Sequence, residues 1–144
     1  ELGHTPKIVT DNLAGEAQEV GKMIVEEIHQ ARPKEVLLYG GETTVSKSGK
    51  GRGGRNLEVG LSALQYLKTD EIIITIASDG HDNGAFGGAV CDLITKKKII
   101  DSGISLEDTL KNNDTYPLFE RIGNYLDMGS TGSNVSDLIV AIKM

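Results

Sequence analysis

The sequence predicts an α/β fold in which a mostly parallel or mixed sheet is flanked by helices. Two short apolar runs, at residues 35–39 and 72–77, are separated by amphipathic segments with helical spacing. Each run is followed by glycines and small polar residues. In such sheets, ligands bind in loops beyond the carboxyl ends of the strands. The 144 residues are enough for one domain and not for two of ordinary size.

The first half of the chain alternates strands and helices. A short extended run at residues 7–10 precedes a helix over residues 17–28, where apolar residues recur at helical spacing: Ala17, Val20, Ile24 and Ile28. Pro33 closes this helix before the strand at residues 35–39. A stripe of leucines predicts a second helix over residues 55–68.

The second half begins with the most clearly buried strand. Residues 72–77 are apolar at every position except Thr75, a pattern that suits a parallel sheet covered on both faces. Beyond it the sequence predicts a helix from residue 85 to about 95, two short helices and a last strand, at residues 106–111, 116–122 and 137–142.

Composition excludes several function classes. A net charge of −6, from 15 Lys and Arg against 21 Asp and Glu, argues against a nucleic-acid-binding protein. The longest apolar run is too short to span a membrane. The single cysteine, Cys91, is expected in the core and suits a reducing compartment, so we expect a cytoplasmic protein. The chain begins at Glu1 with no Met and no leader, which predicts a piece of a longer protein.

The loop after the first apolar strand is rich in glycine and positive charge. Between residues 47 and 55 it has no acid and four cations: Lys47, Lys50, Arg52 and Arg55. Glycine lets backbone N–H groups approach an anion, and a helix beginning near Arg55 would add its positive end. The loop therefore predicts a phosphate or carboxylate site; the alternative is a mobile surface loop with solvated charges.

Two nucleotide-binding motifs can be tested in the same loop. Residues 49–54 match G-x-G-x-x-G, but that fingerprint belongs immediately after a strand, and a glycine-rich chain easily gives a chance match. The P-loop motif is absent, because no Gly-Lys-Ser/Thr follows a correctly spaced glycine.

The loop at residues 78–84 carries Asp79 and Asp82 at the end of the buried strand. Two carboxylates there can hold Mg²⁺, orient a hydroxyl or take its proton. The simpler alternative is that Asp79 caps the following turn. His81 is expected to be solvated, and an EF-hand is excluded because Val90 stands where Glu is required.

A third loop, at residues 129–134, offers hydroxyls and backbone donors suited to an oxyanion. Its alternative is a plain turn before the last strand. Because it precedes a strand instead of following one, its position relative to the other two loops stays open.

Together the loops resemble the signature of the MOFRL domain. The motifs follow in the family's order: Gly40-Gly41-Glu42-Thr43-Thr44-Val45, Gly49-x-Gly51-x-Gly53-Gly54-Arg55-Asn56-x-Glu58, Ser78-Asp79-Gly80-x-Asp82-x-Gly84, Asn113-Asp114 and Thr131-Gly132-Ser133-Asn134-Val135-x-Asp137-Leu138. The likeness spans about residues 36–142. One departure is Asp82-Asn83-Gly84, where Asp-Gly is common in the family.

That domain forms the C-terminal part of glycerate 2-kinases, formerly described as hydroxypyruvate reductases. The resemblance implies phosphorylation of D-glycerate to 2-phosphoglycerate by ATP, with Mg²⁺ or another divalent cation. It also implies an active site between this domain, residues 1–144, and a larger N-terminal domain that contributes a Lys and is absent here. The chain alone is then expected to be inactive, and a homodimer stays open.

By the same resemblance, Arg55 and Asp79 match the family's active-site Arg and Asp. We expect Arg55 to grip the glycerate carboxylate or the transferring phosphoryl group, and Asp79 to orient or deprotonate the attacking hydroxyl. Either Asp79 or Asp82 is expected to hold the metal. The expected substrate- or phosphate-binding residues are Gly41, Glu42, Thr43, Thr44, Gly53, Gly54, Asn56, Asp82, Thr131 and Asn134.

Two other functions stay open on the sequence. One is an NAD(P)H-dependent hydroxypyruvate reductase, which depends on the G-x-G-x-x-G match. The other is a non-catalytic module that binds an anionic metabolite.

Overall fold

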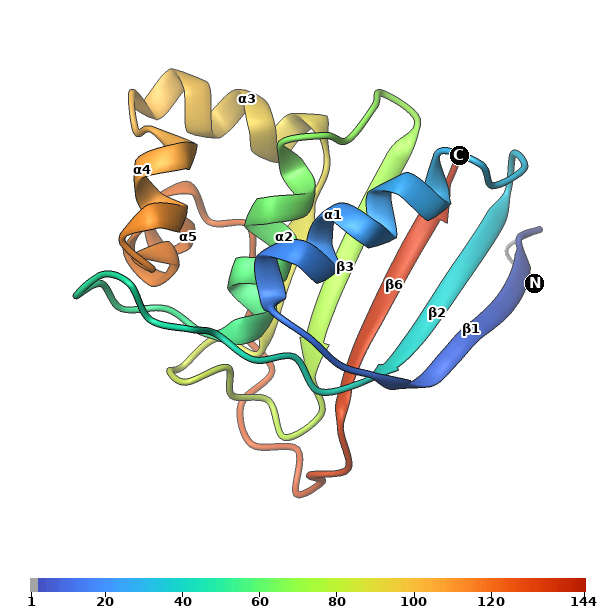
Figure 1. The fold of residues 1–144 in the computed structure, drawn as a ribbon, viewed down its shortest axis with the longest axis horizontal. Coiled ribbons are helices and arrows are strands. Elements are labelled where there is room, and N and C mark those ends of the chain that lie inside the picture. Colours follow the sequence, from blue (N-terminus) through green and yellow to red (C-terminus); the bar gives the residue numbers. More distant parts are fainter. Residues whose placement is uncertain (1–2) are drawn as a thin grey trace.

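The computed structural model describes residues 3–144 and contains a mixed sheet of six strands in the order β1-β2-β6-β3-β4-β5. The strands are β1 (Thr5–Leu13), β2 (Glu35–Gly41), β3 (Glu71–Ala77), β4 (Gly88–Cys91), β5 (Tyr125–Leu126) and β6 (Asp137–Lys143). The helices are α1 (Ala17–Ile28), α2 (Arg55–Leu64), α3 (Leu93–Ser102), α4 (Leu106–Lys111) and α5 (Thr115–Ile122). Helices α1 and α2 lie side by side on one face of the sheet (Figure 1). The predicted α/β class with a mixed sheet is confirmed.

Most neighbouring strands of the sheet run in opposite directions. Only β1 and β2 pair in parallel, whereas β6 is antiparallel to both β2 and β3, and β3 is antiparallel to β4. The prediction of a parallel strand covered on both faces at residues 72–77 is therefore wrong. Burial alternates along β3: Ile73 and Thr75 are fully buried on the α2 side, and Ile72, Ile74 and Ile76 are partly exposed on the other.

The predicted helix from residue 85 to about 95 is wrong in its first half. Gly88–Cys91 forms β4, where Gly88 has φ 148° and lies so close to the backbone of Thr75 that a side chain would collide. Helix α3 begins only after Asp92, whose side chain accepts a hydrogen bond from the backbone N–H of Thr95 at 2.8 Å. Cys91 is buried in the core as predicted, but it lies on a strand.

Helix α2 is the central element of the core. Every residue from Asn56 to Leu64 is buried, because α1 packs beside the helix and the sheet lies beneath it. Gly21 of α1 sits so close to the backbone of α2 that an added side chain would meet the carbonyl of Val59. The helix ends at Leu64 instead of the predicted residue 68. Within residues 3–144, no helix has the length and apolar character to cross a membrane.

The strand directions bring all three predicted loops to one edge of the sheet. Strands β2 and β3 end there and β6 begins there, with Asp137 paired to both Gly41 and Ala77. The loops around residues 42–54, 78–84 and 129–134 leave from this edge, at the bottom of Figure 1. The third loop, whose place the sequence left open, therefore lies beside the other two because its strand is antiparallel.

Candidate active site

The three loops enclose a hollow of about 700 Å³ at this edge. Most of the predicted binding residues line it: Glu42, Thr43, Thr44, Gly53, Gly54, Arg55, Asp79, Asp82 and Asn134. The lining also includes Lys47, one of the four cations of the predicted anion site, and residues that we did not predict for the site: Val45, Glu58, His81, Asn83 and Asn113. Three predicted residues, Gly41, Asn56 and Thr131, are not part of the lining.

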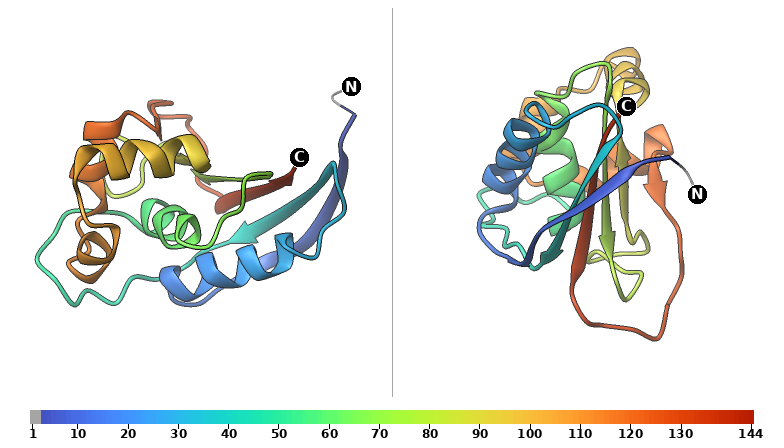
Figure 2. Two further views of the ribbon diagram at one scale, coloured as in Figure 1. Left: turned by 90° about the horizontal axis from the view of Figure 1, so that it is seen from above. Right: turned by 90° about the vertical axis from the view of Figure 1, so that its right-hand side faces the viewer.

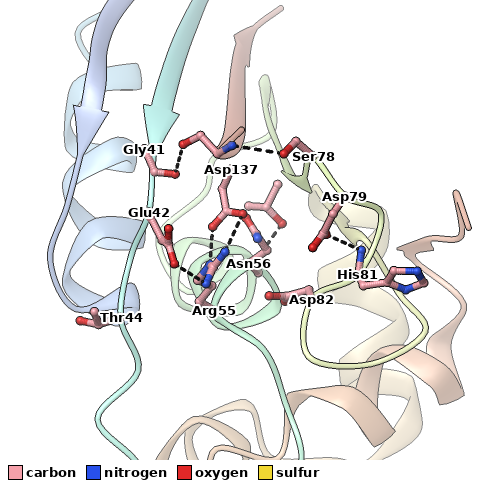
Figure 3. A network of polar contacts seen from close by, with 12 residues as sticks. Gly41, Glu42, Thr44, Arg55, Asn56, Ser78, Asp79, His81, Asp82 and Asp137 are labelled. Atoms are coloured by element: carbon pink, nitrogen blue, oxygen red, sulfur yellow. Dashed lines mark hydrogen bonds and ion pairs between the residues drawn. The ribbon is translucent and has the colours of Figure 1, made fainter. Parts of the chain in front are cut away.

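Arg55 is the first residue of α2 and is held by Asp137 of β6 and by Glu42, just after β2 (Figure 3). Its Nε and Nη2 donate to the two carboxylate oxygens of Asp137, at 2.5 and 3.2 Å, and its Nη1 donates to Glu42 at 2.8 Å. The hydrogen bond to Asp137 raises the pKa of Arg55, so the guanidinium stays charged. These contacts use three of its five N–H donors. The half-exposed guanidinium can therefore still bind an anion.

Asp137 is a residue of the site that our sequence prediction missed. It is the first residue of β6, its side chain is 7% exposed, and it forms a paired hydrogen bond with Arg55. Such paired Arg–carboxylate contacts fix the plane of the guanidinium. A signal existed in the sequence, because Asp137 is the one acid at the start of an otherwise apolar strand. Nothing in the sequence says that it faces Arg55.

The hollow has more acids than cations along its walls. Two cations line it, Lys47 and Arg55, against four acids: Glu42, Glu58, Asp79 and Asp82. The other two cations of the glycine-rich loop lie elsewhere: Arg52 stacks over the ring of Tyr116 at 4.1 Å, and Lys50 lines a separate depression beside α4. The predicted cationic site is thus only half formed. A phosphate chain would need a further positive charge, from a divalent cation or another domain.

Asp82 occupies the N-terminal end of α2. Asp82 is 3% exposed, and its carboxylate accepts a hydrogen bond from the backbone N–H of Leu57 at 2.8 Å, with a further bond from the backbone of Asn56. Gly54, just before the helix, leaves room for this carboxylate, which a side chain there would displace. The positive end of α2 is therefore used by Asp82 and is not free to bind a substrate anion.

Burial raises the pKa of Asp82 from 3.8 to about 6, although the backbone donors act in the opposite direction. The folded chain therefore favours the protonated carboxyl, and we expect the stability of the chain to fall as pH rises from about 4 to about 6. A pKa shift of about two units corresponds to a change of roughly 3 kcal/mol at most in the free energy of unfolding. Asp82→Asn keeps an acceptor for α2 and should remove this part of the pH dependence, measured by urea unfolding between pH 4 and 7.

Two results complete that test. Asp82→Ala should destabilise the chain at every pH, because the N–H groups of α2 lose their acceptor. Identical pH dependence in the parent and Asp82→Asn chains would show that Asp82 titrates normally.

Asp79 lies two residues beyond β3, with its carboxylate in the hollow (Figure 3). Its Oδ1 accepts the backbone N–H of His81 at 2.9 Å, so Asp79 does stabilise the following turn. Gly80 makes this turn with φ 88°, and a side chain on it would collide with the carbonyl of Gly129. Oδ2 of Asp79 accepts no hydrogen bond from residues 3–144 and is available to a ligand. His81 is exposed, as predicted.

The two predicted metal residues differ in what they can offer a cation. In the described part of the chain, no three His, Cys, Asp or Glu side chains are grouped to hold a metal by themselves. Mg²⁺ needs less, since one or two carboxylates with phosphate oxygens and waters suffice. Asp79 fits this requirement through its unpaired oxygen, whereas Asp82 is engaged with the backbone of α2.

The glycine-rich loop is anchored to the turn between α4 and α5. Asn113, 2% exposed, accepts the backbone N–H groups of Ser48 at 2.9 Å and Gly49 at 3.0 Å, and donates to Glu58 at 2.9 Å. A side chain at Gly49 would collide with the backbone of Asn112. The loop is therefore held in place by two hydrogen bonds to the buried side chain of Asn113, which argues against a mobile surface loop.

We expect Asn113→Ala to release this loop. The change removes two acceptor contacts to the loop and leaves the buried Glu58 carboxylate with one donor fewer, a loss of about 1–3 kcal/mol in the free energy of unfolding. Hydrogen exchange should become faster at the amides of Ser48 and Gly49. Asn112→Ala is the matched control, because the side chain of Asn112 bonds only to the carbonyl of Asp108. Unchanged exchange in Asn113→Ala would mean that the loop is held by packing alone.

The third loop is tied to the ends of β2 and β3. Thr131 donates its hydroxyl to the carbonyl of Ser78, and Ser136 donates its hydroxyl to the carbonyl of Gly41 at 2.7 Å. Ser78 accepts in turn from the backbone N–H of Ser136 at 3.2 Å (Figure 3). Thr131 is thus a residue that shapes the loop, while Asn134 on the same loop reaches the hollow.

Three other predicted binding residues have structural contacts. Thr44 donates to Glu16 at 3.2 Å, which ties its loop to the start of α1. Gly41 has φ 151° and lies against the backbone of β1, where a side chain would collide. Asn56 is 1% exposed, and its backbone carbonyl accepts the hydroxyl of Thr75 at 2.9 Å. Its Nδ2 has no hydrogen-bond partner among residues 3–144.

The sequence matches the MOFRL family over residues 35–137, which is most of the chain. The chain belongs to the MOFRL family. This MOFRL chain is 39% identical to a glycerate 2-kinase of Pyrococcus horikoshii over 151 residues, covering 98% of this chain and 34% of that protein. It is 36% identical to a D-glycerate 2-kinase of Thermotoga maritima over 152 residues, covering 99% of this chain and 36% of the other.

The structure agrees with these relatives. The crystal structure of a glycerate kinase from Thermotoga maritima superposes with a TM-score of 0.92 at 35% identity, over 99% of this MOFRL chain and 37% of that one. A structure from Pyrococcus horikoshii superposes equally well, over 99% of this chain and 35% of that one. The chain thus spans about a third of the length of the curated relatives it matches.

Proposed function

We propose that this chain is the C-terminal part of a glycerate 2-kinase, which transfers the γ-phosphoryl group of ATP to the 2-hydroxyl of D-glycerate. The observation that carries the proposal is that Arg55, at the start of α2, and Asp79, on the loop after β3, line one hollow, in a chain whose relatives include glycerate 2-kinases. Because those relatives are about three times as long, we propose that a larger N-terminal domain completes the site.

In this proposal Arg55 binds negative charge. Its guanidinium is fixed by Asp137 and Glu42, and its free N–H donors bind the glycerate carboxylate or the phosphoryl group in transfer. A donor fixed before the reaction stabilises the transition state without reorganising. Asp137 therefore acts as a positioning residue for Arg55.

Asp79 acts on the attacking hydroxyl. Its oxygen without a hydrogen bond accepts the proton of the 2-hydroxyl, while the glycerate oxygen bonds to the γ-phosphorus and the bond to the ADP oxygen breaks. In the alternative role, this oxygen of Asp79 would hold Mg²⁺, which would neutralise charge on the phosphate oxygens. The excess of acids in the hollow favours this requirement for a metal. It also favours a cation from the N-terminal domain, where the resemblance implies a lysine.

The alternative functions have less support. Residues 49–54 do not follow β2 directly and are fastened to Asn113, so they lack the strand–loop–helix context of a dinucleotide-binding fingerprint. A non-catalytic module would not account for the likeness to glycerate 2-kinases over nearly the whole chain. We also propose a cytoplasmic location, because Cys91 is free and buried, which suits a reducing compartment.

The test uses the natural-length protein with ATP, Mg²⁺ and D-glycerate, followed by phosphorus NMR. A 2-phosphoglycerate signal is the expected result. A 3-phosphoglycerate signal would keep the kinase but overturn the position of transfer, and absence of product would overturn the kinase. The 144-residue chain alone should be inactive, so turnover by it at an ordinary kinase rate would contradict the two-domain proposal.

A further inference from the structure

Glu58 is a buried acid of the hollow to which the proposed function gives no role. It lies on α2, three residues after Arg55, and is 2% exposed. Residues three apart stand on the same side of a helix, with their Cβ atoms about 5–6 Å apart, and both residues line the hollow. Burial raises the pKa of Glu58, so a charge on this carboxylate needs partners that replace the lost water.

Two amide side chains hold one oxygen of this carboxylate. Gln18 donates to Oε1 of Glu58 at 2.6 Å, and Asn113 donates to the same oxygen at 2.9 Å. Backbone groups fix the orientation of both amides. The carbonyl of Leu110 accepts from Gln18 at 3.3 Å, and N–H groups of the glycine-rich loop, which arches past α4 in the left view of Figure 2, donate to Asn113. Oε1 is therefore the acceptor of both contacts.

The second oxygen of Glu58 faces the hollow. Oε2 accepts no hydrogen bond from residues 3–144. It is still open to the surface, unlike the sealed unpaired atoms Asn56 Nδ2 and Thr115 Oγ1, and Glu58 lines the hollow. Because the two contacts to Oε1 fix the plane of the carboxylate, Oε2 presents an acceptor in a fixed direction to a ligand in the hollow.

The contacts within the chain do not require a charge at position 58. The carbonyl oxygen of a glutamine there would accept from Gln18 and Asn113 equally well. A buried carboxylate costs more free energy than a buried amide unless a donor meets its charge. Lys47 lowers the pKa of Glu58 from a distance, but no ion pair joins these two described residues. The donor therefore comes from a ligand, and phosphate oxygens are excluded because they repel a carboxylate.

Glycerate has a hydroxyl beside the reacting centre. In the proposed function Arg55 binds either the glycerate carboxylate or the phosphoryl group in transfer, so in both cases the reacting atoms lie beside Arg55. The 3-hydroxyl of glycerate is on the carbon next to the one that carries the reacting 2-hydroxyl. The ribose hydroxyls of ATP are separated from the γ-phosphorus by two further phosphates. The hydroxyl within reach of an acceptor one turn of α2 from Arg55 is therefore the 3-hydroxyl.

We infer that Glu58 is a specificity-determining residue whose Oε2 accepts a hydrogen bond from the 3-hydroxyl of glycerate. The inference rests on the proposed function. When Arg55 binds the carboxylate and Asp79 the 2-hydroxyl, this contact gives glycerate a third point of attachment. A 2-hydroxy acid without the 3-hydroxyl leaves Oε2 buried and unpaired, and the site rejects it.

The test compares D-glycerate with D-lactate, which lacks only the 3-hydroxyl, as substrates of the natural-length protein with ATP and Mg²⁺. The parent protein should favour D-glycerate in kcat/KM by about 100-fold or more, because a site that binds a substrate hydroxyl rejects the analogue without it. Glu58→Gln keeps the acceptor for both amides and loses the charged acceptor in the hollow. It should leave D-lactate nearly unchanged and reduce the preference to about 10-fold or less.

Gln18→Ala is the matched control, because it removes a donor to Oε1 and leaves Oε2 in place. It should change kcat/KM for both substrates alike and keep the preference. If Glu58→Gln also changes both alike, Glu58 supports only the fold or a contact with the N-terminal domain, and the inference is overturned. ATP is also compared with its 2′-deoxy and 3′-deoxy forms. A preference for ATP that Glu58→Gln abolishes would assign Glu58 to the ribose and overturn the contact with glycerate.

Calorimetric binding of D-glycerate and D-lactate without ATP separates this inference from the proposed function. A preference for D-glycerate that Glu58→Gln abolishes, in a protein without turnover, supports the inference and overturns the kinase. Turnover with an unchanged preference in Glu58→Gln overturns the inference alone, and neither binding nor turnover of D-glycerate overturns both.

Circular dichroism checks that Glu58→Gln is folded. If it is not, the parent protein is given the glycerate analogue that has an ammonium group in place of the 3-hydroxyl. A free carboxylate oxygen facing carbon 3 pairs with this cation, so its kcat/KM should stay within about 10-fold of that for D-glycerate. Rejection of the analogue by about 100-fold or more, as expected where no acid faces carbon 3, overturns the inference.

Discussion

Arg55→Ala in the natural-length enzyme is expected to lower kcat/KM by about 100-fold or more. The change removes a fixed charge that accounts for half of the cations lining the hollow, and preorganised donors of this kind contribute about 10²–10³ to catalysis. It also leaves Asp137, 8% exposed, without its partner. The measurement is initial-rate kinetics with D-glycerate and ATP varied in turn.

The two kinetic constants separate the two roles proposed for Arg55. If it binds the glycerate carboxylate equally in ground and transition states, KM for glycerate rises and kcat changes little. If it stabilises the transferring phosphoryl group, kcat falls. Arg55→Lys keeps the charge but loses the paired contact with Asp137, so we expect it to recover only part of the rate.

Arg52→Ala is the matched control. Arg52 belongs to the same loop, but it stacks on Tyr116 and lies 3.9 Å from Glu120, outside the lining of the hollow. We expect near-parental kinetics from it. Equal losses in Arg52→Ala and Arg55→Ala would show that the charge of the loop as a whole is what matters, and parental turnover in Arg55→Ala would remove Arg55 from the mechanism.

This contrast shows where prediction from the sequence ends. The loop has four cations in nine residues, and spacing alone cannot tell which of them face a ligand. The answer depends on the α4–α5 turn, where Asn113 binds the loop and Tyr116 binds Arg52. Those contacts join residues more than 60 positions apart, and no local pattern encodes them.

The fold was predictable where the local sequence pattern and the tertiary contacts favour the same secondary structure. The apolar run of β2 and the helical spacing of α1 each match the observed elements closely. The prediction of a helix from residue 85 was wrong because the segment Gly88–Cys91 is short and consists mostly of small residues. Its strand conformation comes from pairing with β3 and from packing beneath α2. The hydrophobic pattern could not predict the direction of the strands either, since an apolar run such as residues 72–77 can form a parallel or an antiparallel strand.

In the candidate site, too, local features could be predicted from the sequence and contacts between distant residues could not. Composition pointed to the Gly-rich loops at strand ends, with their four cations and the acids Asp79 and Asp82. The resemblance to the MOFRL domain singled out Arg55 and Asp79 among them. The sequence could not show that Asp82 binds the N-terminus of α2 from 25 positions away, or that Asp137 fixes Arg55 from 82 away. Buried polar partners of this kind are set by the fold, and the sequence marks them only as isolated acids.

Asp79→Asn is expected to lower kcat/KM of the natural-length enzyme by about 100-fold or more. Asparagine keeps an oxygen that can accept the N–H of His81, so the turn should persist. It cannot take the proton of the glycerate hydroxyl, and general-base catalysis typically raises the rate by about 10²–10⁴-fold. Asp101→Asn is the control, because Asp101 is an exposed residue of α3 paired only with Lys97.

A titration with Mg²⁺ decides which function of Asp79 is lost. If its carboxylate holds the metal, Asp79→Asn will need more Mg²⁺ to reach half of its maximal rate, since the site loses a charged ligand. If it acts only on the hydroxyl, kcat falls and the Mg²⁺ dependence stays parental. Parental turnover would show that Asp79 does not take the proton of the glycerate hydroxyl, and would leave Glu42 and Glu58 as the other acids of the hollow to be tested.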